Sequence, residues 1–177
     1  RRKIVRRSDT RKHLIHNTHS ALGGRNKASH LCHYGNKCRL STANSINIGR
    51  LVPQIVYYVY AYAKLLQNEE ITLGEEINVV VPTGNFGNIL AAYFAKQMGI
   101  PIAKLICASN ENKVLFDFFE TGVYDKNREF ILTISPSMDI LISSNLERLL
   151  YLIADEDSEK TKELMEELKS TGKYTIT

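Results

Sequence analysis

The chain has 177 residues, of which 44% are hydrophobic, and a formal net charge of +4 at pH 7. This length and composition suit one globular core. No apolar run reaches the roughly 18 residues of a membrane-spanning helix. Three cysteines without paired spacing indicate no disulfide framework, so we expect a cytoplasmic protein with no membrane partner.

Residues 1–40 differ sharply in composition from the rest of the chain. They hold 11 Lys/Arg and one acidic residue, which gives this segment a formal net charge of +10. Residues 41–177 hold 12 Lys/Arg and 18 acidic residues, which gives them a formal net charge of −6. All five histidines also lie in the first 40 residues. The division predicts an unrelated basic segment at 1–40, followed by a domain of a different kind.

Three interpretations of the basic segment compete. A basic arm for nucleic acid or another anionic surface would explain its clustered arginines. A metal site could draw on His30, Cys32, His33 and Cys38, but their spacing matches no standard zinc finger, so we expect no metal. The abrupt change near Ser41 favours the third interpretation, in which residues 1–40 are disordered or out of frame and no nucleic acid is bound.

The first regular element is a long helix. Its apolar residues recur every three or four positions and are Ile48, Leu51, Val52, Ile55, Val56, Val59 and Ala63. Polar residues at 41–45 suit its cap, and Pro53 falls in its first turns. We expect the tyrosines at 57–62 to occupy core and rim positions.

Residues 77–98 predict a strand, a glycine-rich turn and a helix. An apolar run ends at Pro82, and helical spacing resumes after Thr-Gly-Asn-Phe-Gly-Asn at 83–88. Gly84 and Gly87 can take positive φ and carry no Cβ, so the backbone can turn tightly and approach a ligand.

Several N–H groups would then face one concavity, beside the positive end of the helix macrodipole. This predicts a site for a phosphate or carboxylate, with the side chains of Asn85 and Asn88 beside it and Asn88 available as the N-cap. An ordinary turn that binds nothing is the alternative. The spacing fits neither a P-loop nor a dinucleotide fingerprint.

A second strand at 104–108 follows. A strand, a helix and a strand in sequence predict a right-handed crossover with parallel pairing, which brings the loops at 83–88 and 109–112 together. We expect Asn110 and Asn112 to cap the next helix, which ends at Gly122, with ligand contact as the alternative.

The C-terminal part predicts two more helices. Ser144 and Glu147 have the spacing of a capping box and precede an apolar helix that runs to Ile153. A charged helix at 155–170 then ends near Gly172, within a third segment at 154–177.

Four blocks of this sequence resemble threonine synthase, a member of the fold type II family of pyridoxal-phosphate enzymes. They are Ala-Asn-Ser-Ile-Asn-Ile-Gly-Arg-Leu at 43–51 with Gln54, Pro-Thr-Gly-Asn-Phe-Gly-Asn at 82–88, Ala-Ser-Asn-Glu-Asn at 108–112, and Leu-Thr-Ile-Ser-Pro-Ser-Met-Asp-Ile at 132–140. The blocks stand in the family's order and cover residues 41 to about 153. The resemblance implies an α/β core fragment of the tryptophan synthase β-like architecture, with parallel strands and flanking helices.

The resemblance also implies a cofactor, pyridoxal 5′-phosphate. Its phosphate would be bound by the loop residues Gly84, Asn85, Phe86, Gly87 and Asn88. The substrate-pocket residues implied by the first block are Asn44, Ser45, Asn47 and Arg50. The alternative is that Asn44 and Ser45 only cap the helix and that Arg50 is solvated.

The implied reaction converts O-phospho-L-homoserine and water to L-threonine and phosphate. The family's Schiff-base lysine precedes an aspartate in a segment ahead of the first block, and no lysine of this chain is followed by Asp. The family's C-terminal portion is also missing. We therefore assign no catalytic residue and expect an internal fragment that is inactive alone.

Two other functions stay open. Another fold type II enzyme, a dehydratase or a cysteine synthase, would share the cofactor, although those loops usually carry more consecutive glycines. A basic-tailed anion-binding module is the non-enzyme alternative. The sequence does not indicate the oligomeric state.

Overall fold

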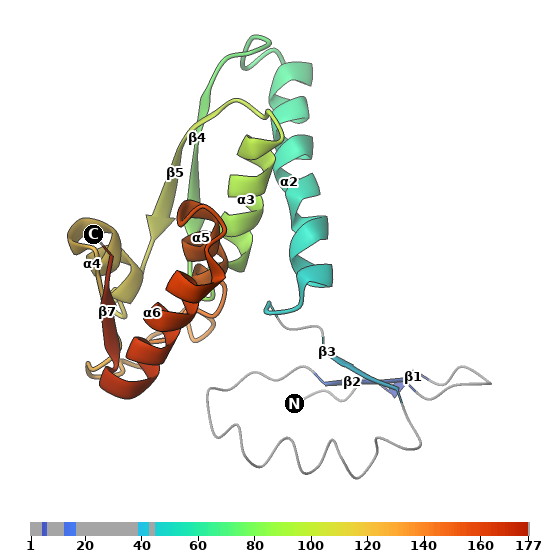
Figure 1. Cartoon of the computed structure of the whole chain (residues 1–177). Coiled ribbons are helices and arrows are strands. Elements are labelled where there is room, and N and C mark those ends of the chain that lie inside the picture. Colours follow the sequence, from blue (N-terminus) through green and yellow to red (C-terminus); the bar gives the residue numbers. More distant parts are fainter. Residues whose placement is uncertain (1–4, 7–12, 17–38, 43–44, 177) are drawn as a thin grey trace. The chain divides into compact units, whose positions relative to one another are not determined.

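The computed structural model describes residues 5–6, 13–16, 39–42 and 45–176, and it divides into two compact units, Arg1–Arg50 and Leu51–Thr177. In the first unit, β1 (Val5–Arg6), β2 (His13–His16) and β3 (Arg39–Thr42) form a sheet in that order (Figure 1). β1 is antiparallel to β2, and β2 is parallel to β3. The candidate metal ligands at 30–38 lie outside the described residues.

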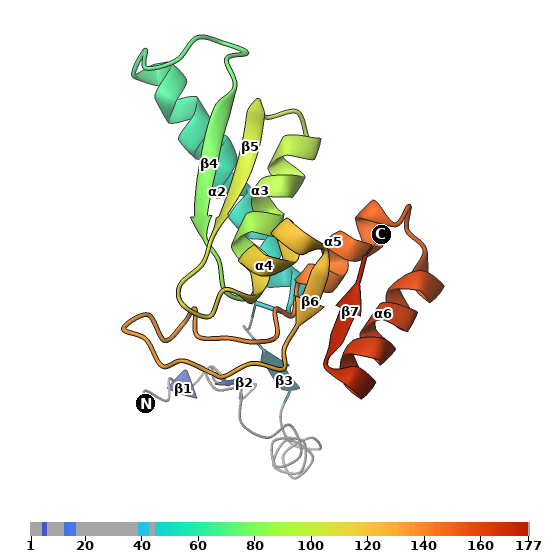
Figure 2. The same ribbon diagram turned by 90° about the vertical axis from the view of Figure 1, so that its left-hand side faces the viewer.

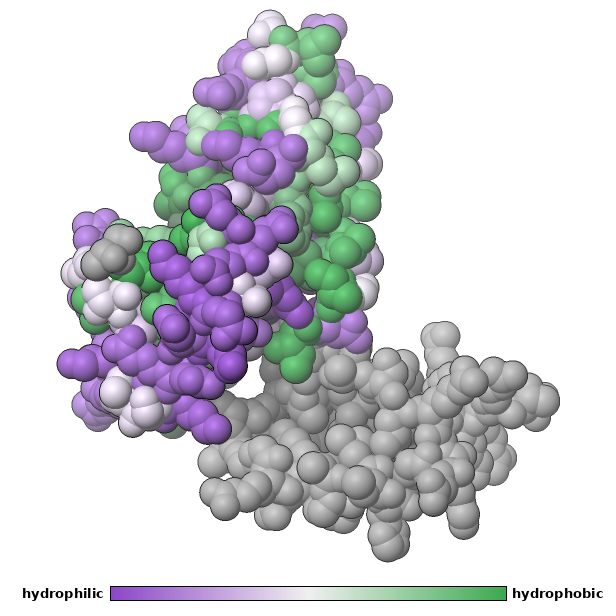
Figure 3. Space-filling view, in the orientation of Figure 1, coloured by the Kyte–Doolittle hydropathy of each residue, from purple (hydrophilic) through white to green (hydrophobic). Residues whose placement is uncertain are grey.

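Helix α2 (Ile48–Gln67) matches the predicted long helix and contains Pro53. Leu51 and Tyr62 are buried, and the Tyr62 hydroxyl donates to the Glu75 carbonyl oxygen. The packing prediction is wrong for Tyr57 and Tyr60, whose exposed fractions are 60% and 62%. They belong to an apolar face of α2 that is solvent-exposed in the described structure (Figure 3).

The centre of the second unit is the predicted strand, helix and strand. β4 (Ile77–Pro82) pairs in parallel with β5 (Ile102–Ala108), and α3 (Gly87–Gln97) connects them, which confirms the predicted parallel pairing through a helix. Both α2 and α3 lie on one side of the strand pair (Figures 1 and 2). Helix α3 is buried over much of its surface, and its fully buried residues are Leu90 and the small residues Ala91, Ala92 and Ala95, which let neighbouring elements pack closely against it.

Three aromatic rings connect the remaining elements. Phe118 lies on α4 (Val114–Thr121), Tyr124 on β6 (Val123–Asp125) and Tyr174 on β7 (Lys173–Thr175). The tyrosine rings stack with centroids 5.2 Å apart, and Phe118 meets each of them edge-on. Antiparallel pairing of β6 with β7 thus brings the end of the chain back to α4.

Helices α5 (Leu146–Ile153) and α6 (Ser158–Thr171) complete the second unit. Asp157 caps α6 by accepting from the N–H groups of Glu159 and Lys160, and Gly172 ends it with a φ of 83°. The predicted capping box is wrong, because α5 has Asn145 as its N-cap residue and no side-chain cap. Within the described residues, none of the helices is both long and apolar enough to cross a membrane.

Candidate anion-binding site

The loop at 83–88 begins on a rigid base at the carboxyl ends of both strands. The N–H of buried Thr83 donates to the Ala108 carbonyl oxygen at 2.8 Å, and its hydroxyl donates to the Val81 carbonyl oxygen at 2.7 Å. Cys107 lies beside it, and burial raises the pKa of its thiol. The start of the loop is therefore anchored to β4 and β5.

The left-handed residue of the loop is Phe86, with a φ of 63°, and neither Gly84 nor Gly87 has a positive φ. The predicted use of these glycines for positive φ is therefore wrong. The buried Phe86 side chain stacks on Phe119, with ring centroids 6.0 Å apart. This packing compensates for a backbone conformation that is uncommon outside glycine.

Gly84 is needed for close packing. A Cβ built on it would lie 3.0 Å from the Ser137 carbonyl oxygen and 3.3 Å from the Met138 Cα. Real Cβ atoms rarely come so near to backbone. The segment at 137–140 therefore contacts the loop directly, which the sequence did not indicate.

Two carbonyls of the loop are held by residues that lie about 60 positions further along the chain. The Ser143 hydroxyl donates to the Gly84 oxygen at 2.9 Å. Asn145 donates twice to the Asn85 oxygen, from its backbone N at 3.2 Å and from Nδ2 at 2.8 Å. We call Ser143 and Asn145 the anchor pair. The sequence gives no sign of this role, because polar residues ahead of a helix are typical of a cap.

The N–H groups of residues 85 to 89 donate to no acceptor within the described part of the chain, and the first intrahelical bond of this region is from Leu90 N to the Phe86 oxygen. These amides belong to the loop and the first turn of α3, at the positive end of its macrodipole. No acidic side chain lies within 82–98. The arrangement is therefore suited to bind an anion.

Asn88 connects this turn to α2. The Tyr58 hydroxyl donates to the Asn88 carbonyl oxygen at 3.1 Å and also to Asn88 Oδ1. The Tyr58 phenol is protonated at neutral pH and can donate, and burial raises its pKa further, to about 12. The predicted N-cap role of Asn88 is wrong, because α3 begins at Gly87 and Phe86 is its N-cap residue.

A second polar cluster connects the loop after β5 to the segment at 133–139 and is centred on buried Asp139. Asn110 Nδ2 and Asn112 Nδ2 donate to Asp139 Oδ1 at 2.7 and 3.1 Å. Thr133 donates from its N–H and its hydroxyl at 2.9 and 2.7 Å. The capping prediction for Asn110 and Asn112 is therefore wrong, and α4 has Lys113 as its N-cap residue instead. The cluster holds the segment that packs on Gly84.

The Asp139 cluster predicts a loss of stability in acid. The backbone N–H of Thr133, followed by its hydroxyl and the two asparagine amides, lowers the pKa of the Asp139 carboxyl. A carboxyl whose pKa is lower when folded stabilises the protein above its unfolded pKa, about 3.9, and this contribution is lost as pH falls through the folded pKa. Urea unfolding should show a fall in stability below about pH 4 that is smaller in Asp139→Asn. Exposed Glu129→Gln is the control, and an unchanged acid loss in Asp139→Asn would contradict the prediction.

The predicted substrate residues of the first block belong to the first unit. Asn44 lies outside the described residues, and Ser45 is half-buried. Asn47 Oδ1 accepts from the Gly49 N–H at 2.9 Å, so Asn47 caps the start of α2. Arg50 is exposed. Their contact with substrate stays a prediction.

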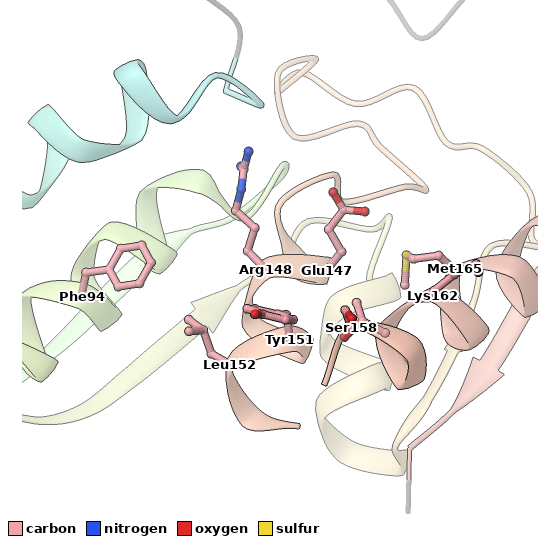
Figure 4. Close-up of a pocket in the computed structure, with 9 residues that line it drawn as sticks. Phe94, Glu147, Arg148, Tyr151, Leu152, Ser158, Lys162 and Met165 are labelled. Atoms are coloured by element: carbon pink, nitrogen blue, oxygen red, sulfur yellow. The ribbon is translucent and has the colours of Figure 1, made fainter. Parts of the chain in front are cut away.

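Two cavities lie in the second unit. One of about 470 Å³ lies between α3, α5 and α6, where Phe94, Tyr151 and Met165 line it, and it contains no predicted site residue (Figure 4). The other, of about 440 Å³, has an apolar lining that includes Phe86 and Cys107. The amide-rich turn is thus distinct from the first cavity, and its Phe86 side chain lines the second.

Comparisons with known proteins agree with the resemblance. No protein-family model matches the sequence. The chain is 55% identical over 138 residues to threonine synthase-like 1 of Homo sapiens, covering 77% of this chain and 19% of that protein. It is 41% identical over 152 residues to threonine synthase of Saccharomyces cerevisiae, covering 81% of this chain and 29% of that protein.

Solved structures give the same result. A PLP-bound threonine synthase from Brucella melitensis matches 93% of this chain and 34% of its own, with a TM-score of 0.74 and 39% identity. Yeast threonine synthase matches 80% of this chain and 29% of its own, with a TM-score of 0.71 and 41% identity. This likeness confirms the α/β fold predicted, with a parallel strand pair and flanking helices of the fold type II architecture. The chain belongs to the threonine synthase family, and it spans about a fifth to a third of the length of these relatives.

Proposed function

We propose that the turn at 83–88 binds the phosphate group of pyridoxal 5′-phosphate. The observation that carries this proposal is the set of N–H groups at 85–89 that donate to no acceptor among the described residues, in a chain 39% identical to a PLP-bound threonine synthase. A phosphate offers several strong acceptor oxygens, and the first turn of α3 offers donors and a positive dipole end. The cofactor-binding residues proposed are Gly84, Asn85, Phe86, Gly87 and Asn88.

The residues present fit this group. Acidic side chains are absent from the turn, so the turn itself carries no negative charge that would oppose a dianion. Asn88 is held against α2 by Tyr58, and Phe86 is fixed by its stacking on Phe119. The donors therefore need little rearrangement when an anion binds, which lowers the entropic cost of binding.

We further propose that the whole protein converts O-phospho-L-homoserine and water to L-threonine and phosphate. The family membership supports this reaction. Bound pyridoxal phosphate supplies an electron sink for carbanion chemistry. In this chain, the turn would hold and orient the cofactor, and Asn44, Ser45, Asn47 and Arg50 would contact the substrate, with Arg50 toward its anionic group.

This chain alone is proposed to be inactive. It contains no lysine followed by Asp, and without the covalent lysine the central step lacks its nucleophile and proton carrier. Binding is therefore the proper readout for this chain. PLP-dependent phosphate release from O-phosphohomoserine by the purified chain would contradict the proposed inactivity.

The chain should bind pyridoxine 5′-phosphate at least about tenfold more tightly than pyridoxine, because hydrogen bonds to a charged group contribute about 1.5–3 kcal/mol each. Neither compound has an aldehyde, so surface lysines cannot react with them. Titration followed by calorimetry measures both affinities. Equal affinities would show that the turn does not bind the phosphate.

A further inference from the structure

We propose that Asn145, supported by Ser143, is a positioning residue that directs the amides of Asn85 and Phe86 toward the bound phosphate. This inference rests on the proposed function, because it concerns the same turn. Asn145 lies 60 residues from Asn85 in sequence, and its side chain is fully buried. It acts on the ligand only through the backbone of the turn.

The geometry of the peptide unit sets the direction of these two amides. The Gly84 carbonyl shares a peptide unit with the Asn85 N–H, and the Asn85 carbonyl shares one with the Phe86 N–H. In a trans peptide the C=O and N–H point to opposite sides, and all peptide bonds of the described residues are trans. The anchor pair holds both carbonyls on its own side. Both N–H groups must therefore point away from it.

The side-chain amide of Asn145 is itself oriented. Arg148 NH1 donates to Asn145 Oδ1, so the amide oxygen faces the guanidinium and Nδ2 faces the Asn85 oxygen. The opposite orientation would place two oxygens against each other and an N–H₂ against a cation. The backbone N of Asn145 donates to the same Asn85 oxygen, so both bonds hold one peptide plane.

The anchor pair is fixed to the core of the unit. The N–H of Ser143 donates to the Tyr124 hydroxyl at 2.9 Å, and that hydroxyl donates to the Leu141 carbonyl oxygen at 3.0 Å. Tyr124 stacks on Tyr174 in the aromatic cluster. Gly84 also packs closely against the backbone of Ser137. The peptide planes of the turn are therefore held by buried groups before any ligand binds.

The test compares two buried asparagines in the intact chain. Asn145→Ala removes the Nδ2 bond to the turn. Asn112→Ala removes amide bonds to Ile131 and Asp139 but no hydrogen bond to the turn, and the bonds from Asn110 and Thr133 still hold Asp139 in place. Both variants should lower the urea midpoint. Only Asn145→Ala should weaken pyridoxine 5′-phosphate binding, by about tenfold, the loss of roughly one well-directed donor.

Amide resonances give a readout that a purely structural role would not move. In the wild-type chain, the Asn85 and Phe86 N–H signals should shift on adding pyridoxine 5′-phosphate, and in Asn145→Ala these shifts should shrink. If Asn145→Ala does not fold, Ser143→Ala replaces it, because it removes only the bond from the hydroxyl to the Gly84 oxygen. An equal loss of affinity in the Asn112→Ala control, or unchanged affinity and shifts in the Asn145→Ala or Ser143→Ala variant, would overturn the inference. Failure of the wild-type chain to bind would instead overturn the proposed function.

Discussion

Replacing Phe118 by alanine should lower the free energy of unfolding by about 3–5 kcal/mol. Phe118 is 2% exposed, and its ring contacts Tyr124 and Tyr174 at centroid distances of 5.7 and 5.8 Å. Its removal leaves a cavity where α4, β6 and β7 meet. We expect the largest stability effect here, because one ring holds together elements about 50 residues apart in sequence.

Urea unfolding followed by tyrosine fluorescence measures the effect. Phe116→Ala is the matched control, since Phe116 lies on the same helix but is 49% exposed. The control should change the free energy of unfolding by less than about 1 kcal/mol, as is usual for surface positions. Similar losses in the two variants would show that the aromatic cluster does not organise this part of the fold.

Replacing Gly84 by valine should weaken pyridoxine 5′-phosphate binding by more than about tenfold and cost about 1–3 kcal/mol of stability. The new Cβ would come within 3.0 Å of the Ser137 carbonyl oxygen, and that atom belongs to backbone. The turn must therefore move away from segment 137–140. Moving it breaks the bond from Ser143 to the Gly84 oxygen and turns the Asn85 N–H out of position.

Gly99→Val is the control for this substitution. Gly99 follows the other end of α3 and has a φ of 102°. Valine at this position strains the backbone, so it should lower the free energy of unfolding about as much as Gly84→Val does. A Cβ there meets nothing within 4 Å. The Gly99→Val variant should be less stable than the wild-type chain but should bind pyridoxine 5′-phosphate with the same affinity. Equal loss of binding in both variants would mean that stability alone, and not the position of the turn, controls affinity.

The elements whose signals are local could be predicted from the sequence. Helix α2, the β4–α3–β5 unit and helix α6 all follow apolar periodicities of 3.6 or 2 residues, and Gly172 ends α6 as expected. The turn at 83–88 was also found, because a strand, a glycine-rich segment and a helix are adjacent in sequence. Its amides donate to no acceptor among the described residues, and the binding of a phosphate by them stays a prediction.

Side-chain partners could not be predicted where they are distant in sequence. Asn110, Asn112 and Ser144 all precede helices, and short polar residues there usually cap them. In the fold, the two asparagine amides bind Asp139 instead, 29 and 27 residues away. A buried carboxylate needs donors wherever the chain supplies them, and this need outweighed the local preference for capping.

The sequence by itself determined which residues form the strand, turn and helix of the anion site, because hydrophobic period and glycine placement act over a few residues. Only the tertiary structure decided that Phe86 takes the left-handed conformation and that Asn145 holds the Asn85 carbonyl. It also decided that close packing against the Ser137 backbone leaves no room for a side chain at Gly84. These features depend on contacts between segments about 30 to 60 residues apart. Such contacts arise from packing around a shared core, which no local pattern specifies.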